Sequence, residues 1–101
     1  MFNTYTLTAK IAFHRTIEGG RKKPVYSGYR PSFAFNTSRH YSGEIQLVDK
    51  EILYPGESTT VTIKLLPART IRKTLKKNDA FTITEGNKVI GAGVIENAVL
   101  N

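Results

Sequence analysis

The sequence predicts a small all-β domain, built either as a closed β-barrel or as a sandwich of two sheets. Apolar and polar residues alternate with a period of two along most of the chain, which is the spacing of side chains on the two faces of a strand. Turn-forming residues separate about six such runs. The 101 residues suit a single domain, because a chain of this length can bury a modest core.

The N-terminal half contains three expected strands. The apolar face of residues 5–13 consists of Tyr5, Leu7, Ala9, Ile11 and Phe13. Residues 33–35 repeat the alternation over a shorter run, with phenylalanine at both ends. Residues 41–47 follow, with Tyr41, Ile45 and Leu47 on one face. Each pattern indicates a strand that turns one face toward the core.

The C-terminal half contains three more expected strands. The first covers residues 59–65, and one of its faces consists of Thr59, Val61, Ile63 and Leu65. Residues 81–83 form a short run, and Glu85-Gly86-Asn87-Lys88 after it predicts a tight hairpin. Residues 89–95 are nearly all small or apolar, which is typical of a strand covered on both faces. Gly91 and Gly93 are expected to let neighbouring strands approach closely.

One segment departs from the strand pattern. Residues 68–77, ARTIRKTLKK, contain five basic residues and no acidic one. Ile71 and Leu75 are four residues apart, which predicts one or two turns of helix. The expected core comprises Leu7, Ile11, Phe33, Phe35, Ile45, Val61, Ile63, Phe81, Ile83 and Val94.

The composition is strongly basic, with a net charge of +7 and a pI near 9.9. This balance favours an anionic partner, although a surface charge that only solubilises the protein gives the same composition. The absence of cysteine excludes disulfides and thiolate metal sites. The N-terminus lacks a signal-peptide pattern, and no segment approaches the ~20 apolar residues of a spanning helix. We therefore expect a cytoplasmic protein without a membrane partner.

The sequence shows no catalytic or cofactor-binding constellation. His14 and His40 lack the spacing and companions of a zinc site, so both are expected to be surface histidines or to be satisfied by neighbours. The phosphate-binding loop and nucleophile-elbow motifs are absent. Gly91-Ala92-Gly93 resembles the start of a dinucleotide fingerprint, but no helix pattern follows it. We expect no enzyme activity, no cofactor and no metal.

Several motifs occur in a recognisable order. Residues 19–35 read GGRKKPVYSGYRPSFAF, Tyr54-Pro55-Gly56-Glu57 forms a turn motif, and residues 84–95 read TEGNKVIGAGVI. Together with Gly43 and Pro67, these motifs resemble the C-terminal domain of elongation factor Tu. The resemblance covers nearly the whole chain. It implies one six-stranded antiparallel closed β-barrel over residues 1–101.

In that family the barrel accompanies a GTPase domain and a second barrel, in a protein that carries aminoacyl-tRNA to the ribosome. The phosphate-binding and guanine-specificity motifs of a GTPase domain are absent from this sequence. The resemblance therefore implies a stand-alone, non-catalytic binding module that binds no nucleotide.

The resemblance also implies a tRNA-facing surface. Glu85-Gly86 matches hairpin residues that contact tRNA in the family, and Ser42 stands in for a contacting threonine. Ser32 replaces a glutamine of longer reach. Two hairpin arginines of the family become Thr84 and Lys88, so a guanidinium fork is lost while backbone and hydroxyl contacts can persist. A plain hairpin with no binding role has the same turn residues.

A second family surface faces the GTPase domain and involves the Gly-Gly-Arg loop and the loop after Pro67. Gly19, Gly20 and Arg21 are kept, whereas the later loop has become residues 68–77. This surface is therefore either a cationic interface or a solvated loop.

Two hypotheses follow. The chain binds RNA, either tRNA or rRNA, mainly through phosphates, or it is a protein-interaction module that mimics elongation factor Tu toward one of that factor's partners. Self-association is also open. Tyr26 and Tyr29 are candidates for stacking on bases, although core packing is the expected role of both. The candidate RNA-binding residues are Arg21, Lys22, Lys23, Ser42, Arg69, Arg72, Lys73, Lys76, Lys77, Glu85, Gly86 and Lys88.

Overall fold

The structure is a computed structural model that describes residues 5–35, 39–66 and 75–100. These residues are nearly all in strands or in the turns between them. The strands are β1 (Tyr5–Phe13), β2 (Val25–Tyr26), β3 (Ser32–Ala34), β4 (Tyr41–Leu47), β5 (Ile52–Leu53), β6 (Ser58–Leu65), β7 (Ala80–Glu85) and β8 (Lys88–Leu100). A single 3-10 turn, η1 (Thr16–Glu18), follows β1 among the described residues.

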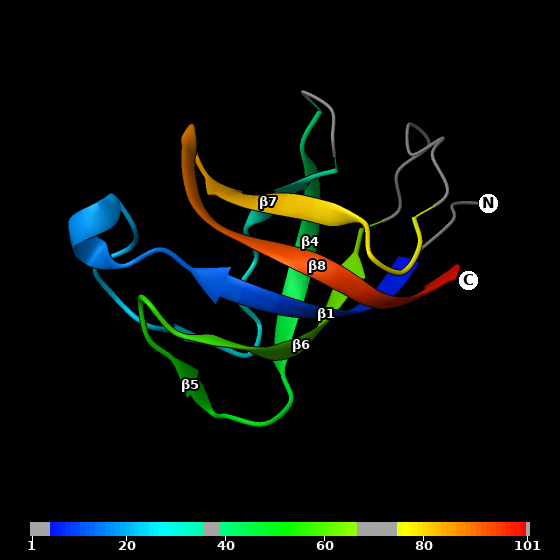
Figure 1. Ribbon diagram of the computed structural model, residues 1–101, viewed down its shortest axis with the longest axis horizontal. Coiled ribbons are helices and arrows are strands. Elements are labelled where there is room, and N and C mark those ends of the chain that lie inside the picture. The colour runs from blue at the N-terminus through cyan, green and yellow to red at the C-terminus, as the bar shows by residue number, and fades with distance from the viewer. Residues whose placement is uncertain (1–4, 36–38, 67–74, 101) are drawn as a thin grey trace.

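Six of the strands close into an antiparallel barrel in the order β1-β6-β4-β3-β7-β8 (Figure 1). The remaining two, β2 and β5, pair with each other in a small separate sheet. Closure leaves no open edge in the main sheet, so each barrel strand is paired on both sides. The predicted fold class is confirmed, and of the two architectures considered the barrel is correct.

The core fills the barrel interior with the inward residues of each strand. In β1 every odd-numbered residue from Tyr5 to Phe13 is buried. Phe33 is fully buried and packs edge-on against Phe81, with ring centroids 5.9 Å apart. The predicted core residues that are buried are Leu7, Ile11, Phe33, Phe35, Ile45, Val61, Ile63, Phe81 and Ile83.

Two predictions about β8 were wrong. Val94 is 43% exposed, and residues 89–95 are not covered on both faces. Val94 pairs with Lys10 and Ala80, both exposed, so it lies on the outer side of the barrel wall. A closed barrel buries only its inner face, so Gly91 and Gly93 face the core whereas Ala92 and Val94 line the surface.

The closing hairpin and the glycines of β8 agree with the sequence. Glu85 pairs with Lys88 across a two-residue turn, and Gly86 has φ of 63°, a dihedral that favours glycine. A Cβ added to Gly93 would lie 2.5 Å from the Phe81 ring, so the predicted close approach is confirmed there. The helix predicted for residues 68–77 falls mostly outside the described residues.

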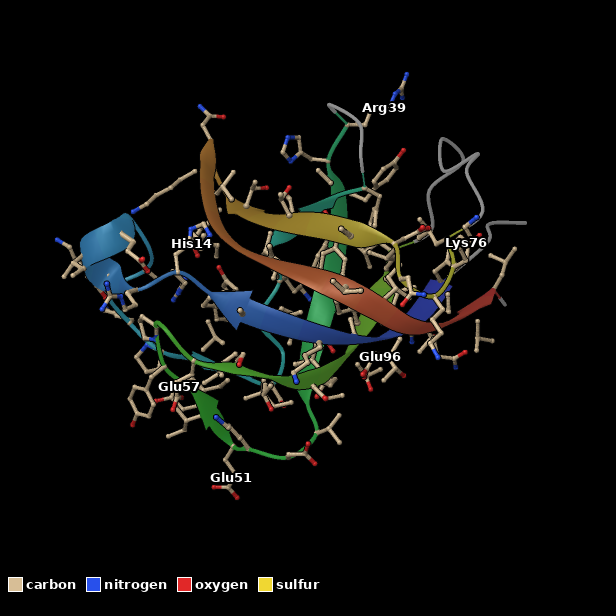
Figure 2. All side chains as sticks on the ribbon, in the orientation of Figure 1. His14, Arg39, Glu51, Glu57, Lys76 and Glu96 are labelled. Atoms are coloured by element: carbon tan, nitrogen blue, oxygen red, sulfur yellow. The ribbon has the colours of Figure 1, made fainter. Side chains whose placement is uncertain are left out.

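The barrel has two ends that carry different loops. We call one the hairpin end, formed by the loop of residues 14–24 and by the β7–β8 hairpin. We call the other the lysine end, formed by residues 75–79. β7 runs from one end to the other over six residues, which corresponds to about 20 Å of strand. Figure 1 shows η1 on the opposite side of the barrel from the C-terminal end of β8, and Figure 2 shows Lys76 on the same side as that end of β8.

Candidate functional site

The hairpin end is closed by three polar side chains from distant parts of the sequence. The Arg21 guanidinium lies over the ring of Tyr29, 4.7 Å from its centroid, and forms an ion pair with Glu85. Tyr29 in turn packs edge-on against Phe13 at the end of the core, with ring centroids 6.4 Å apart. Only 18% of the Arg21 side chain is exposed, against 48% for Glu85. Arg21 therefore covers the barrel end.

Hydrogen bonds through the Tyr29 hydroxyl also join the three side chains of this cluster. Tyr29 donates its hydroxyl proton to Glu85 and accepts a hydrogen bond of 3.1 Å from Arg21 Nη1. Burial, followed by the hydrogen bond to the Glu85 carboxylate, raises the pKa of Tyr29 well above the usual value of a tyrosine. The phenol therefore stays protonated throughout the physiological pH range.

A second contact fastens the same loop to the hairpin. Lys88 Nζ donates to the carbonyl oxygen of Gly20 over 3.3 Å. Lys88 is opposite Glu85 in the hairpin, so both side chains leave the same side of the ribbon and reach the loop. Three predicted RNA-binding residues, Arg21, Glu85 and Lys88, are thus brought together. Each of them also has a bonding partner within the protein.

The outer surface of the barrel next to the hairpin carries a group of hydroxyls. Ser32 is directly opposite Ser42 on β4 and opposite Thr84 on β7. Directly opposite residues in a sheet point to the same face, and the neighbouring Phe33 and Ile83 point inward. We call Ser32, Ser42 and Thr84 the hydroxyl wall. The predicted residue Ser42 is exposed on it.

Thr84 is outward-facing but only 3% exposed. Its hydroxyl lies 3.5 Å from the carbonyl oxygen of Ser32 and 3.1 Å from Nδ1 of His40. His40 is a member of this site that was not predicted from the sequence. The missed signal is its position directly before β4, two residues from Ser42.

Two exposed lysines lie beside the hairpin, and the carboxylates on the hairpin and on β4 are paired. Lys22 and Lys23 are exposed in the loop that follows Gly20. Beside the hydroxyl wall, Arg30 forms an ion pair of 3.2 Å with Glu44. The Gln46 amide and the Arg30 guanidinium hold the pKa of the Glu44 carboxyl below its usual value. Because Glu44 and Glu85 each pair with an arginine, the lysines give this end a positive charge.

The remaining predicted site residues lie elsewhere. Lys76 and Lys77 are exposed at the lysine end, so they do not share a surface with Lys22 and Lys23. The predicted contacts Arg69, Arg72 and Lys73 lie outside the described residues. Tyr26 is 56% exposed, so its expected core role was wrong. Tyr29 does pack against the core, as expected.

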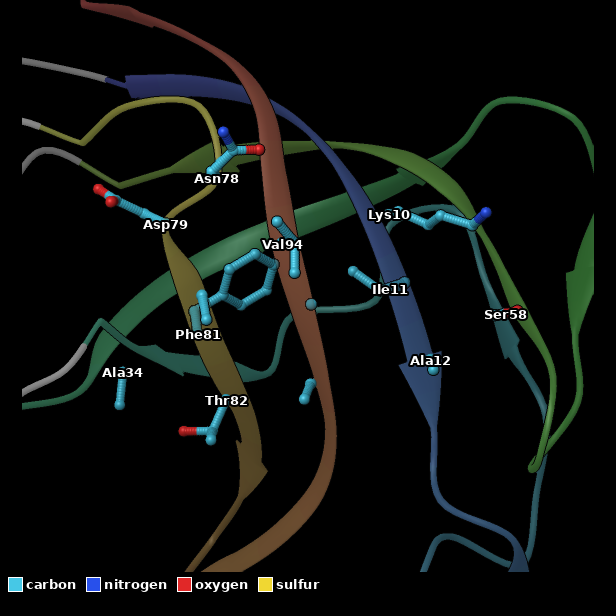
Figure 3. Close-up of a pocket in the computed structure, with 13 residues that line it drawn as sticks. Lys10, Ile11, Ala12, Ala34, Ser58, Asn78, Asp79, Phe81, Thr82 and Val94 are labelled. Atoms are coloured by element: carbon cyan, nitrogen blue, oxygen red, sulfur yellow. The ribbon is translucent and has the colours of Figure 1, made fainter.

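A shallow groove of about 1220 Å³ runs over the outer faces of β1, β8 and β7 (Figure 3). Its floor is a row of small residues that are opposite one another in successive strands. This row consists of Ser58, Ala12, Ala92, Thr82 and Ala34. Lys10 and Asp79 also line the groove. The opposite charges of Lys10 and Asp79 leave this surface close to neutral, in contrast to the hairpin end.

Within the described ranges, no three histidine, aspartate or glutamate side chains are grouped so that they can hold a metal ion. In the same ranges no helix is long and apolar enough to cross a bilayer.

The fold and its surfaces define a small antiparallel β-barrel domain in which loops and strand ends carry the charged and polar groups. A family model described as the elongation factor Tu C-terminal domain matches residues 2–99. The chain belongs to this family, which confirms the resemblance found in the sequence. It is therefore a translation-factor-like domain, and the barrel domain of this family is non-catalytic.

Proposed function

We propose that this chain is a non-catalytic RNA-binding module that contacts tRNA or rRNA with its hairpin end and the adjoining hydroxyl wall. One observation carries the proposal. Candidate contact residues from three separate parts of the sequence, near positions 21, 42 and 85–88, meet at the hairpin end and the adjoining hydroxyl wall. We expect the module to act in the cytoplasm, where these RNAs are used.

The charge distribution supports this location. Lys22 and Lys23 are exposed beside a hairpin whose carboxylate is already neutralised by Arg21. Phosphate oxygens are attracted to such lysines without sequence preference. The exposed hydroxyl of Ser42 supplies a shorter-range donor for a phosphate or a ribose 2′-hydroxyl.

The paired residues have a different role in this proposal. Arg21 holds Glu85, and Lys88 holds the backbone of Gly20. These contacts fix the loop against the hairpin, so that Lys22 and Lys23 are presented from a defined position. A preorganised surface loses less conformational entropy when the ligand binds.

The experiment compares two charge reversals in the intact chain. Lys22→Glu with Lys23→Glu alters the hairpin end, and Lys76→Glu with Lys77→Glu alters the lysine end. Each pair lowers the formal net charge from +7 by the same amount. RNA affinity is measured over a salt series by fluorescence anisotropy with a labelled tRNA.

We expect the hairpin-end pair to weaken binding strongly and to lower the log–log salt slope by up to ~1.4–1.8, because each phosphate contact contributes ~0.7–0.9. We expect the lysine-end pair to have a much smaller effect. Equal effects of both pairs, or a larger effect at the lysine end, would contradict the proposed location. Absence of RNA binding by the unaltered chain would contradict the function itself.

A second candidate function is favoured by the groove on β1, β8 and β7. A nearly neutral groove offers no net positive charge to attract a phosphate backbone, so a protein segment is the better occupant. On this hypothesis the chain binds a protein that also recognises elongation factor Tu, and so competes with that factor for it.

This alternative has its own test. Ala92→Arg fills the groove with a long side chain, whereas Val99→Arg places the same charge elsewhere on β8, at another exposed position. Binding of the purified nucleotide-exchange factor of elongation factor Tu is measured by calorimetry. Binding that is lost in Ala92→Arg and kept in Val99→Arg supports the protein-interaction role. Unchanged binding, or none in the unaltered chain, argues against it for this partner.

A further inference from the structure

His40 is hydrogen-bonded to the hydroxyl wall, although the residue remains exposed. The residue directly precedes β4, and its Nδ1 lies 3.1 Å from the hydroxyl of Thr84 on β7. Thr84 lies in turn 3.5 Å from the carbonyl oxygen of Ser32 on β3. The imidazole therefore joins three strands at the place where Ser42 is exposed.

The single hydroxyl hydrogen of Thr84 determines which imidazole nitrogen of His40 is left for a ligand. A threonine hydroxyl has one hydrogen to donate. When Thr84 donates to the carbonyl of Ser32, its oxygen accepts from Nδ1 of His40. Nδ1 then carries a hydrogen whether the ring is neutral or charged, and Nε2 is left for a ligand. Protonation of the ring adds a charge and a donor at Nε2 without breaking the contact to Thr84.

The elements next to His40 carry charged groups of both signs. Arg39 precedes it in the chain, Glu44 is on β4, Glu85 is on β7 and Lys88 is on β8. β3 contributes only the uncharged Ser32 at this point. Arg30 pairs with Glu44, and Arg21 pairs with Glu85. The carboxylates on β4 and β7 thus each already have a cationic partner.

We propose that His40 is a further RNA-contacting residue, whose protonated ring donates from Nε2 to a phosphate oxygen lying over the hydroxyl wall. The proposal rests on the RNA-binding function proposed above and names a contact within it. Ser42, two residues along the chain, would donate its hydroxyl to the same phosphate or to the adjoining ribose. Histidine is suited to this role because it gains its charge between about pH 8 and pH 5.

The test measures RNA affinity as a function of pH at constant ionic strength, with a labelled tRNA as the probe. Three proteins are compared: the unaltered chain, His40→Gln and His14→Gln. His14 is the only other histidine of the sequence. It follows β1 in the loop of the hairpin end, on a different element from the hydroxyl wall, and no RNA contact is assigned to it. Glutamine keeps an amide that can donate to Thr84, so the wall is preserved while the ionisable group is removed. Thermal unfolding of His40→Gln verifies that it folds.

We expect the unaltered chain and His14→Gln to bind RNA several-fold more tightly at about pH 5.5 than at about pH 8, up to about tenfold. We expect this gain to be absent in His40→Gln, because glutamine does not titrate. A gain of equal size in His40→Gln overturns the role of His40 and leaves RNA binding intact. A failure of all three proteins to bind RNA at any pH overturns the proposed function together with this contact.

Discussion

The two ends of the barrel are both basic, but they use their cations differently. At the hairpin end Arg21 is largely covered, lies on an aromatic ring and is paired with Glu85. At the lysine end Lys76 and Lys77 are exposed in the turn that leads into β7. A basic residue thus covers the core at the hairpin end, whereas the basic residues at the lysine end face solvent.

This difference shows that the number of basic residues does not by itself define a binding surface. Arg21 was predicted as an RNA contact because of its charge and Lys88 because it replaces a hairpin arginine of the family, yet both have partners within the fold. The cations available for a ligand at this end are those next to them, Lys22 and Lys23. A neutralised cluster can still serve binding, because it fixes the loop that presents its neighbours.

The largest expected effect concerns the core that supports both ends. Phe33 is fully buried against Phe81, so Phe33→Ala leaves a cavity and should destabilise the domain by ~3–5 kcal/mol. Urea unfolding measures this change. Because the two ends share one core, we expect them to unfold in a single transition. Separate transitions for the two ends would show that they are independent.

Next in size is the removal of Arg21. Arg21→Ala removes the side chain that covers Tyr29 and pairs with Glu85. We expect the free energy of unfolding to fall by ~1–2 kcal/mol. The loss is moderate because Glu85 can be rehydrated. The matched change at the lysine end, Lys77→Ala, should stay within ~0.5 kcal/mol. Both are measured by urea unfolding. Similar losses of stability in the two variants would show that the basic residues at the two ends contribute equally to folding.

A smaller effect is expected in the turns. Gly86 at the hairpin end and Asn78 at the lysine end both have positive φ, of 63° and 75°. Gly86→Ala should cost ~1 kcal/mol, because a side chain disfavours this region. Asn78→Gly should change the stability by less than ~0.5 kcal/mol, because asparagine already tolerates it. Thermal unfolding compares them, and a neutral Gly86→Ala would mean that the hairpin adjusts its backbone.

The smallest effect appears only in alkaline solution. The pKa of Tyr29 is raised in the folded state, so above about pH 10 the native state retains a proton that the unfolded chain releases. Its contribution to stability is complete below that pH and is lost as the pH rises further. Between about pH 9 and pH 11 the Tm of the unaltered chain should therefore fall more than that of Tyr29→Phe. Parallel curves would indicate that Tyr29 is not the group responsible.

The sequence determined the six strands of the barrel and most of their inward faces, whereas the short strands β2 and β5 were not predicted. Alternation in residues 5–13 and 59–65 marks the buried side chains, because a strand that borders one core must present an apolar residue at every second position. The turn glycines and the ordered family motifs then define a six-stranded barrel. The direction in which each β8 side chain points was harder to predict. Its small residues permit burial on both faces, and only barrel closure shows that Val94 points outward.

The site depended on the tertiary structure. The sequence could identify Arg21, Glu85 and Ser42 as candidates, but it could not show that Arg21 and Glu85 neutralise each other or that Lys22 and Lys76 lie at opposite ends of the barrel. His40 had no motif to mark it. Its link to Thr84 joins residues 44 positions apart, and such contacts arise from strand pairing across the barrel. Local sequence specifies which face a side chain takes, whereas closure of the sheet decides which distant groups meet there.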